Sequence, residues 1–299
     1  MNRRTFLGGL AALGPLNLPA ANTMPIVDTH IHLFDTRRPQ GVPWPPKDSK
    51  ELYRPALPER YRELAVPHGI TAAIEVEASP WVEDNQWVLD IAAKDKIIVG
   101  TVGNLEPDKP DYRKQLERFH RNPLFLGIRY GNLWDRDIHG KLGNSEFVAG
   151  LKELAEAGLV LDTANPTPQL MDDMVRVSDL VPSLRIILDH VPQIEPPKAL
   201  HELAKRPHVY VKVSGVLRRV DGRVPQDLAF YKPRLDQVFE IFGEDRVLYG
   251  SDWPNSDQWG PYSLVFRIVH EYFTAKGPEI ASKYFWKNSM AAYHWKERS

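Results

Sequence analysis

The chain has 299 residues, of which 42% are hydrophobic and 26% charged, the composition of a globular protein rather than a disordered one. With 38 basic and 39 acidic residues the formal net charge is -1, so no global field attracts nucleic acid or an anionic membrane. We therefore expect a small-molecule partner, no nucleic acid and no membrane span. The absence of cysteine excludes disulfides and cysteine-ligated metal sites, so a metal would have to bind to His, Asp, Glu or Lys.

Residues 1–23 have the pattern of an export signal. Arg3 and Arg4 precede an apolar stretch that is too short to span a bilayer, and the small residues Ala20 and Ala21 follow it. This pattern resembles a twin-arginine signal peptide, and an ordinary Sec signal is the alternative. We expect a periplasmic protein with a signal at 1–23 and one folded domain at 24–299.

Short apolar runs alternate with helical patterns along the rest of the chain. The eight runs that we expect to be strands cover residues 25–32, 71–79, 96–104, 125–132, 158–166, 184–192, 209–215 and 246–254. Strands that each precede a helix pair in parallel through right-handed crossovers. Eight such units predict an α/β fold, a single (β/α)8 TIM barrel. An open doubly wound sheet is the alternative, but no glycine-rich phosphate loop follows any of the runs.

The segment after the first predicted strand, 37–55, is rich in proline and too long for a simple connection. Long loops at the carboxyl ends of barrel strands commonly carry function. We expect this loop to cover the site.

Four chemically active side chains lie at predicted strand ends. On the first strand, alternation places Asp28, His30 and His32 on one face, opposite Val27 and Ile31, and the sixth and eighth strands end at His190 and Asp252. Active sites of barrels lie at the carboxyl ends of the strands.

Imidazole nitrogens and a carboxylate are ligands for Zn2+ or Mn2+, so a divalent ion could bind to His30, His32 and Asp252. Taken singly, each of these residues could be a hydrogen-bonded structural residue. Burying three imidazoles and a carboxylate together is costly unless they are paired or used, and this favours a functional site.

Four sequence motifs resemble those of the amidohydrolase superfamily. They are Asp-Thr-His-Ile-His at 28–32, Ile-Leu-Asp-His at 187–190, Val-Lys-Val-Ser-Gly at 211–215 and Tyr-Gly-Ser-Asp-Trp-Pro at 249–254, and the closing segment 287–293 extends the likeness. The chain is most similar to the amidohydrolase 2 branch, which includes sugar lactonases and pyrone-dicarboxylate lactonase.

The resemblance implies a role for each matching residue. Asp252 would remove a proton from the attacking water, His30 and His32 would form the strand-one pair, and His190 would polarise the scissile carbonyl. Metal-dependent members often have a further strand-five ligand, a histidine or carboxylated lysine. This chain has neither there, and alternation leaves the direction of Asp162 open. The family includes members with and without a metal, so the protein could use one divalent ion or none.

Substrate contacts are expected from charged and aromatic residues near the same strand ends. If Ile74 and Val76 face the helices, Glu75 and Glu77 point into the barrel. The same reasoning turns Arg129 and Lys212 inward, where Arg129 could bind a carboxylate or hydroxyl substituent. For Glu75 and Lys212, internal ion pairing is an equal alternative.

Tryptophans also follow the strand ends or lie in the long loop. Trp44 and Trp253 could pack against a sugar ring, as could Trp81 and Trp134, and each could instead only seal the barrel.

Together these patterns predict an enzyme that hydrolyses a lactone, with a sugar-acid lactone as the expected substrate. Two alternatives stay open. One is a metal-dependent non-oxidative decarboxylase of the same superfamily, which would require the missing strand-five histidine. The other is a non-catalytic periplasmic carbohydrate-binding barrel.

Overall fold

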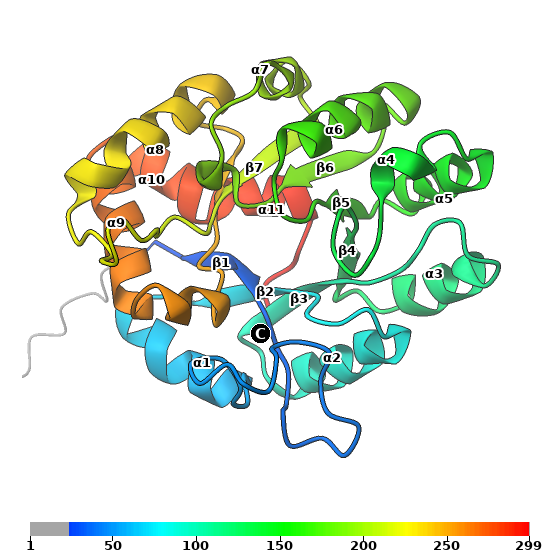
Figure 1. Cartoon of the computed structure of the whole chain (residues 1–299), viewed down its shortest axis with the longest axis horizontal. Coiled ribbons are helices and arrows are strands. Elements are labelled where there is room, and N and C mark those ends of the chain that lie inside the picture. The colour runs from blue at the N-terminus through cyan, green and yellow to red at the C-terminus, as the bar shows by residue number, and fades with distance from the viewer. Residues whose placement is uncertain (1–23, 299) are drawn as a thin grey trace, which may run out of the picture.

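The computed structural model describes residues 24–298. The predicted export signal at 1–23 lies outside the described residues. Eight parallel strands form one sheet in the order β1 to β8, and the helices surround it (Figure 1). The strands are β1 (Val27–Ile31), β2 (Ala72–Val76), β3 (Ile98–Gly103), β4 (Phe125–Arg129), β5 (Val160–Asp162), β6 (Arg185–Leu188), β7 (Val209–Val213) and β8 (Val247–Tyr249). The prediction of a (β/α)8 barrel is confirmed.

Backbone pairing just beyond β8 brings the last strand back to the first. The backbone N–H of His32 donates to the Trp253 carbonyl at 2.7 Å, and the N–H of Asp252 donates to the His30 carbonyl at 2.9 Å. The barrel is thus nearly closed, and its closing seam lies at the predicted site.

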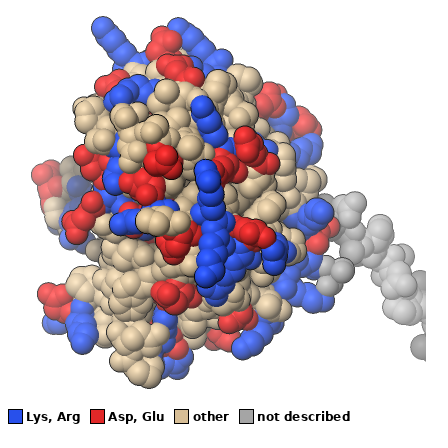
Figure 2. All heavy atoms as spheres, turned by 90° about the vertical axis from the view of Figure 1, so that its right-hand side faces the viewer, with Lys and Arg blue, Asp and Glu red and all other residues tan. Residues whose placement is uncertain are grey.

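Longer and shorter helices alternate with the strands. They are α1 (Pro58–Ala65), α2 (Val82–Lys94), α3 (Tyr112–His120), α4 (Ile138–Lys141), α5 (Ser145–Glu156), α6 (Pro168–Leu180), α7 (Lys198–Ala204), α8 (Leu228–Phe242), α9 (Tyr262–Thr274), α10 (Pro278–Ser282) and α11 (Asn288–Tyr293), with single turns η1 (Val66–His68), η2 (Val191–Gln193), η3 (Asn255–Gln258) and η4 (Lys283–Lys287). No helix within 24–298 is long and apolar enough to cross a membrane. Figure 2 shows acidic and basic side chains interspersed on one face.

The inward faces of β1 and β2 differ from the predicted ones. Val27, Ile74 and Val76 belong to the apolar cluster that fills the barrel, although we expected them to face the helices. Glu75 consequently points outward, where it accepts a hydrogen bond from the Thr101 hydroxyl. The interior of a TIM barrel is filled mainly by branched apolar side chains, and this requirement overrides the predicted inward position of Glu75.

A register shift in β1 turns the Asp28 side chain away from the face of the histidine side chains, although its Oδ1 accepts a 3.2 Å hydrogen bond from the His30 backbone N–H. The pairing with β2 becomes irregular directly after Asp28, so Asp28 does not share the face of His30 as predicted. Its carboxylate accepts hydrogen bonds from the hydroxyls of Tyr61 at 2.9 Å and Tyr262 at 3.1 Å, and from the backbone N–H of Ser251 at 2.8 Å. Asp28 therefore connects β1 to α1, α9 and the turn after β8.

The C-terminal segment closes the amino end of the barrel. Tyr293 and Trp295 pack into the same interior cluster as the strand residues. Arg298 donates hydrogen bonds to the carbonyls of Asp95 at 3.0 Å and Ile98 at 2.7 Å, at the start of β3. The opposite, carboxyl end of the strands is therefore the end open to a substrate.

Candidate active site

The long loop after β1 reaches over this open end. A short antiparallel bridge between Phe34 and Ala56 closes its base, and Arg38 donates a 2.6 Å hydrogen bond to Asp84 at the start of α2. Trp44 lies in this loop with its ring centroid 5.6 Å from that of His32. The loop thus contributes one wall of the site, as expected.

Three imidazole rings meet above the barrel. The ring centroid of His30 lies 4.9 Å from that of His32 and 4.5 Å from that of His190. A glycine makes this packing possible, because a Cβ at Gly250 would lie only 2.8 Å from the His30 Cβ. All three rings are buried, so their hydrogen-bond partners determine their state.

Asp252 faces all three rings with one carboxylate oxygen. Its Oδ1 lies 3.3 Å from His32 Nε2, 3.8 Å from His30 Nε2 and 4.0 Å from His190 Nε2. Its backbone adopts the left-handed conformation with φ 62°. Its Oδ2 accepts a 2.8 Å hydrogen bond from the Asn255 amide. Burial alone would raise the pKa of Asp252, but His190, His32 and His30 hold it below its ordinary value, so the carboxylate is ionised at neutral pH.

His190 has its own hydrogen-bond support. The Ser214 hydroxyl oxygen lies 2.9 Å from His190 Nδ1 and accepts a 3.3 Å hydrogen bond from the His190 backbone N–H. The Ser214 hydroxyl can donate its proton to Nδ1, and in that tautomer the ring proton is on Nε2, facing Asp252. Burial lowers the pKa of His190, with Arg129 acting in the same direction, and the ring is neutral near pH 7.

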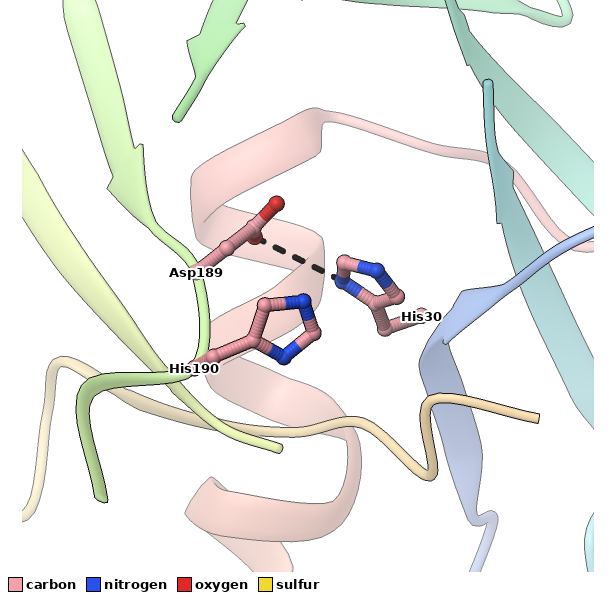
Figure 3. A group of neighbouring side chains, drawn as sticks. All are labelled: His30, Asp189 and His190. Atoms are coloured by element: carbon pink, nitrogen blue, oxygen red, sulfur yellow. Dashed lines mark ion pairs between the residues drawn. The ribbon is translucent and has the colours of Figure 1, made fainter. Parts of the chain in front are cut away.

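Asp189 is a site residue that sequence reasoning missed. It is completely buried, and its Oδ1 lies 3.5 Å from His30 Nδ1 (Figure 3). His190 adopts φ 54°, so the chain turns and both neighbours reach the site, whereas strict alternation allows only one. The motif Ile-Leu-Asp-His was visible in the sequence and offered a signal for both residues.

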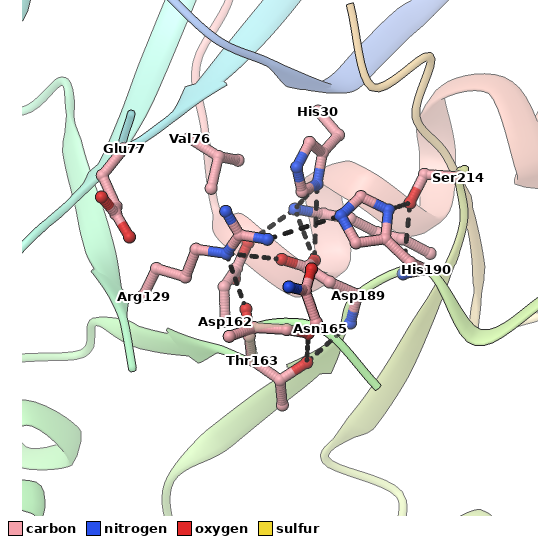
Figure 4. A network of polar contacts seen from close by, with 12 residues as sticks. His30, Val76, Glu77, Arg129, Asp162, Thr163, Asn165, Asp189, His190 and Ser214 are labelled. Carbon is pink, nitrogen blue, oxygen red and sulfur yellow. Dashed lines mark hydrogen bonds and ion pairs between the residues drawn. The ribbon is translucent and has the colours of Figure 1, made fainter. Parts of the chain in front are cut away.

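A buried ion-pair network lies next to His30 and His190 (Figure 4). Lys212 Nζ lies 2.6 Å from Asp162 Oδ2, 3.1 Å from Asp189 Oδ1 and 3.3 Å from His30 Nδ1. Burial raises the pKa of Asp162 to about 6, although Lys212 opposes the shift. Asp162 also accepts a 2.8 Å hydrogen bond from the Tyr293 hydroxyl. Asp162 thus points inward, but its carboxylate is bound by Lys212 and Tyr293 at the floor of the barrel.

Arg129 joins this network from β4, pointing inward as predicted. Its Nε donates a 2.9 Å hydrogen bond to the Thr163 carbonyl and lies 3.2 Å from Asp189 Oδ2. Its Nη2 lies 3.4 Å from His190 Nε2. The guanidinium therefore forms the side of the site between Asp189 and His190.

Glu77 lies just beyond the end of β2, at the mouth of the barrel. Both of its carboxylate oxygens accept a hydrogen bond from Trp134 Nε1, at 2.9 and 3.0 Å. Arg136 Nη1 lies 3.9 Å from the same carboxylate. Burial raises the pKa of Glu77, while Arg129 and Arg136 oppose the shift.

These residues enclose a pocket of about 230 Å³. The residues that line it are His32, Trp44, Glu77, Ala78, Arg129, Leu133, Trp134, Asn165, His190, Asp252 and Asn255. Most of the predicted site residues are therefore present on one surface.

Of the predicted site residues, His30 and Trp253 do not line this pocket, and the expected contact of Trp253 with a sugar ring is corrected. Trp253 is 0% exposed and packs against Tyr61, with the ring centroids 5.3 Å apart. The central guanidinium carbon of Arg60 lies over the Trp253 ring, 5.1 Å from its centroid. Its backbone forms the bridge with Ile31 that closes the barrel. Trp253 therefore has a structural position outside the pocket, and Trp134 takes the place expected for it.

The donor atoms fit a divalent ion. One ligand atom from each of His30, His32 and Asp252 lies within 4.8 Å of the other two. His30 Nε2 and Asp252 Oδ1 are buried without a hydrogen-bond partner. His32 Nδ1 lies 2.7 Å from the Val76 carbonyl, so a proton there leaves the Nε2 lone pair for a metal. His30, Asp189 and His190 form a second cluster of similar size.

A barrel with histidines and an ionised aspartate at its carboxyl end is the arrangement of a hydrolytic enzyme. The model of the amidohydrolase family matches residues 27–295. The chain belongs to this family, as its sequence motifs indicated.

Two curated relatives have similar sequences along most of their length. L-fucono-1,5-lactonase of Burkholderia ambifaria is 28% identical over 89% of this chain and 94% of its own. 4-Sulfomuconolactone hydrolase of Rhizobium radiobacter is 27% identical, over 84% of this chain and 85% of its own.

A solved structure has the same fold. An amidohydrolase of Burkholderia multivorans, crystallised with bound zinc, superimposes with a TM-score of 0.80 at 22% identity, covering 91% of this chain and 99% of its own.

Proposed function

We propose that the protein hydrolyses lactones. One observation carries the proposal: Asp252 Oδ1 is buried, lacks a hydrogen-bond partner, and faces three imidazoles at the edge of a pocket. A water molecule bound there would be next to a substrate carbonyl in the pocket. The chain is 28% and 27% identical to two enzymes that are named as lactone hydrolases, and this similarity supports a lactone, which is a cyclic ester, as the substrate.

In the proposed reaction, the water oxygen attacks the lactone carbonyl carbon while Asp252 accepts a proton from the water. The Nε2 proton of His190 faces the developing oxyanion and stabilises it. The bond from the carbonyl carbon to the ring oxygen then breaks, and the leaving ring oxygen takes up the proton that Asp252 accepted from the water, which restores the Asp252 carboxylate. The products are a hydroxyl group and a carboxylic acid, which releases one proton to solution at neutral pH.

His30, His32 and Asp252 would hold a divalent ion if one is used. Such an ion lowers the pKa of a bound water to about 7 and polarises a carbonyl oxygen. With or without an ion, the chain's own residues orient the groups that react and accept the proton. His32 stays oriented by Val76, and Asp189 and Lys212 fix His30 from below.

The decarboxylase alternative has less support. It requires a metal ligand from the fifth strand, and the inward residue there, Asp162, is bound by Lys212 and Tyr293. A purely binding barrel would have no use for a buried carboxylate ionised beside three imidazoles, because such a group is costly to bury.

The test is acid release, followed with a pH indicator, when the purified protein is given a panel of lactones. Assays after chelation and after addition of Zn2+ or Mn2+ measure the dependence on a divalent ion. Acid release above the spontaneous rate supports the proposal. Unchanged lactone across the panel, from folded protein under every metal condition, would refute it.

We also infer that the chain is exported to the periplasm. The support is the sequence pattern alone, in which Arg3 and Arg4 precede a short apolar stretch. The test is cell fractionation of the full chain and of a variant with both arginines replaced by lysine. Loss of the periplasmic fraction in the variant supports the twin-arginine route, unchanged export in the variant supports Sec, and a cytoplasmic wild type refutes export.

A further inference from the structure

The charges around the pocket occur in matched pairs. Arg129 Nε lies 3.2 Å from Asp189, and Arg136 Nη1 lies 3.9 Å from Glu77. Below the pocket, Lys212 Nζ lies 2.6 Å from Asp162. Of the residues that line the pocket, Arg129 is the only lysine or arginine, and it already faces a buried carboxylate.

The two carboxylates that line the pocket, Asp252 and Glu77, have different partners. Asp252 is paired with three imidazoles and the Asn255 amide and, among the described residues, with no lysine or arginine. Glu77 also faces the pocket, with Trp134 Nε1 on its two oxygens. An anionic substituent beside Glu77 would meet a carboxylate and, among the lining side chains, no unpaired lysine or arginine, and like charges at short distance in a buried site are strongly unfavourable.

The remaining polar groups suit hydroxyl groups. Asn165 and Asn255 line the pocket, and an amide can both donate to and accept from a hydroxyl. An ionised Glu77 carboxylate can only accept hydrogen bonds, so it pairs with a hydroxyl donor. Trp44 and Trp134 supply aromatic surface for the apolar faces of a sugar ring.

We propose that the site selects lactones whose ring substituents are uncharged hydroxyl groups and rejects lactones that carry a second carboxylate or a sulfonate. Glu77 is the residue that determines this choice. The inference rests on the proposed lactone hydrolysis and names the substrate class of the same site.

The experiment compares matched lactone pairs that differ in one terminal group. Galactono-1,4-lactone and glucono-1,4-lactone end in a hydroxymethyl group, and galactaro-1,4-lactone and glucaro-1,4-lactone carry a carboxylate there. For the wild type we expect kcat/KM for the neutral member of a pair to be higher by at least about tenfold, since unfavourable charge in a buried site costs more than one factor of ten.

Two variants assign the effect to Glu77. Glu77→Gln should reduce the ratio of neutral to acidic turnover by about tenfold, because it removes one carboxylate from the pocket and leaves Arg136 unmatched. Glu75→Gln is the matched control: Glu75 lies two residues earlier and is also buried, but it lies outside the group that lines this pocket. We expect it to keep the wild-type ratio.

The outcomes separate this inference from the proposed function. Equal or faster hydrolysis of the acidic lactone overturns the inference and leaves lactone hydrolysis intact, as does an unchanged ratio in Glu77→Gln. If no lactone is hydrolysed, the proposed function fails, and binding of each pair is then measured by the change in intrinsic tryptophan fluorescence, to which Trp44 and Trp134 in the pocket contribute. Tighter binding of the neutral member supports the selection, and equal or weaker binding overturns it.

Discussion

Lys212 Nζ lies 3.3 Å from His30 Nδ1, so the floor of the barrel is connected directly to the active site. The same nitrogen contacts Asp162 and Asp189, and all of these groups are completely buried. A lysine at this position therefore has a structural task and a positioning task, because it balances two carboxylates and limits the orientation of His30.

Replacing Lys212 should destabilise the fold strongly. Lys212→Met leaves two buried carboxylates without their common partner, and breaking a buried pair in this way costs about 3–5 kcal/mol. Urea unfolding measures the loss. Lys205→Met is the control, because Lys205 pairs with Glu202 on the exposed surface of α7 and such a pair contributes about 0–1 kcal/mol. The double variant Lys212→Met with Asp162→Asn should recover part of the loss; equal stability of wild type and Lys212→Met would contradict the account.

Glu75 should make stability fall with rising pH. Burial raises its folded-state pKa to about 8, so the folded state holds a proton that the unfolded state has lost. The stabilisation of the fold by this bound proton is complete below the unfolded-state pKa of about 4.5 and disappears as pH rises through about 8. The slope approaches roughly 1.4 kcal/mol per pH unit within this window.

Glu75→Gln should remove this slope, so that the variant gains stability relative to the wild type as pH rises from 5 to 8. Unfolding free energies from denaturant titrations at several pH values measure the difference. Glu146→Gln, on the exposed surface of α5, should show the wild-type slope. A Glu75→Gln curve parallel to the wild type would show that Glu75 is ionised in the fold.

The sequence predicted the barrel well because each strand is a short apolar run that the fold buries. Individual side-chain directions were harder to predict, because alternation fails where the backbone is irregular. The register shift in β1 turns the Asp28 side chain away from the face of the His30 side chain, and the left-handed conformations of His190 and Asp252 redirect the chain at strand ends. These local conformations depend on closure of the barrel, which no short sequence window contains.

Trp253 and Asp189 illustrate the two kinds of error. Trp253 follows a strand and was expected at the substrate, but barrel closure through its backbone buries its ring. Asp189 precedes the predicted His190, and strict alternation would allow only one of these two neighbours to reach the site. The structure instead places it against His30, Lys212 and Arg129.

Ser214 should affect catalysis without affecting substrate binding. Ser214→Ala removes the hydroxyl 2.9 Å from His190 Nδ1, which weakens the preference for a proton on Nε2. A single hydrogen bond of about 0.5–1.5 kcal/mol corresponds to a roughly 2- to 10-fold lower kcat. Steady-state kinetics should show this decrease with KM nearly unchanged. A change confined to KM would instead place Ser214 in substrate binding, and Ser214→Thr, which keeps the hydroxyl, should restore most of kcat.

The most direct test of the central claim is the lactonase rate of Asp252→Asn. Asparagine keeps the size of the side chain but cannot accept the proton of the attacking water, so kcat should fall by about 10²- to 10⁴-fold. Asp245→Asn, at the exposed opposite end of β8, is the matched control and should keep wild-type activity. If folded Asp252→Asn hydrolyses lactones at the wild-type rate, Asp252 is not the proton acceptor and the proposed mechanism is wrong.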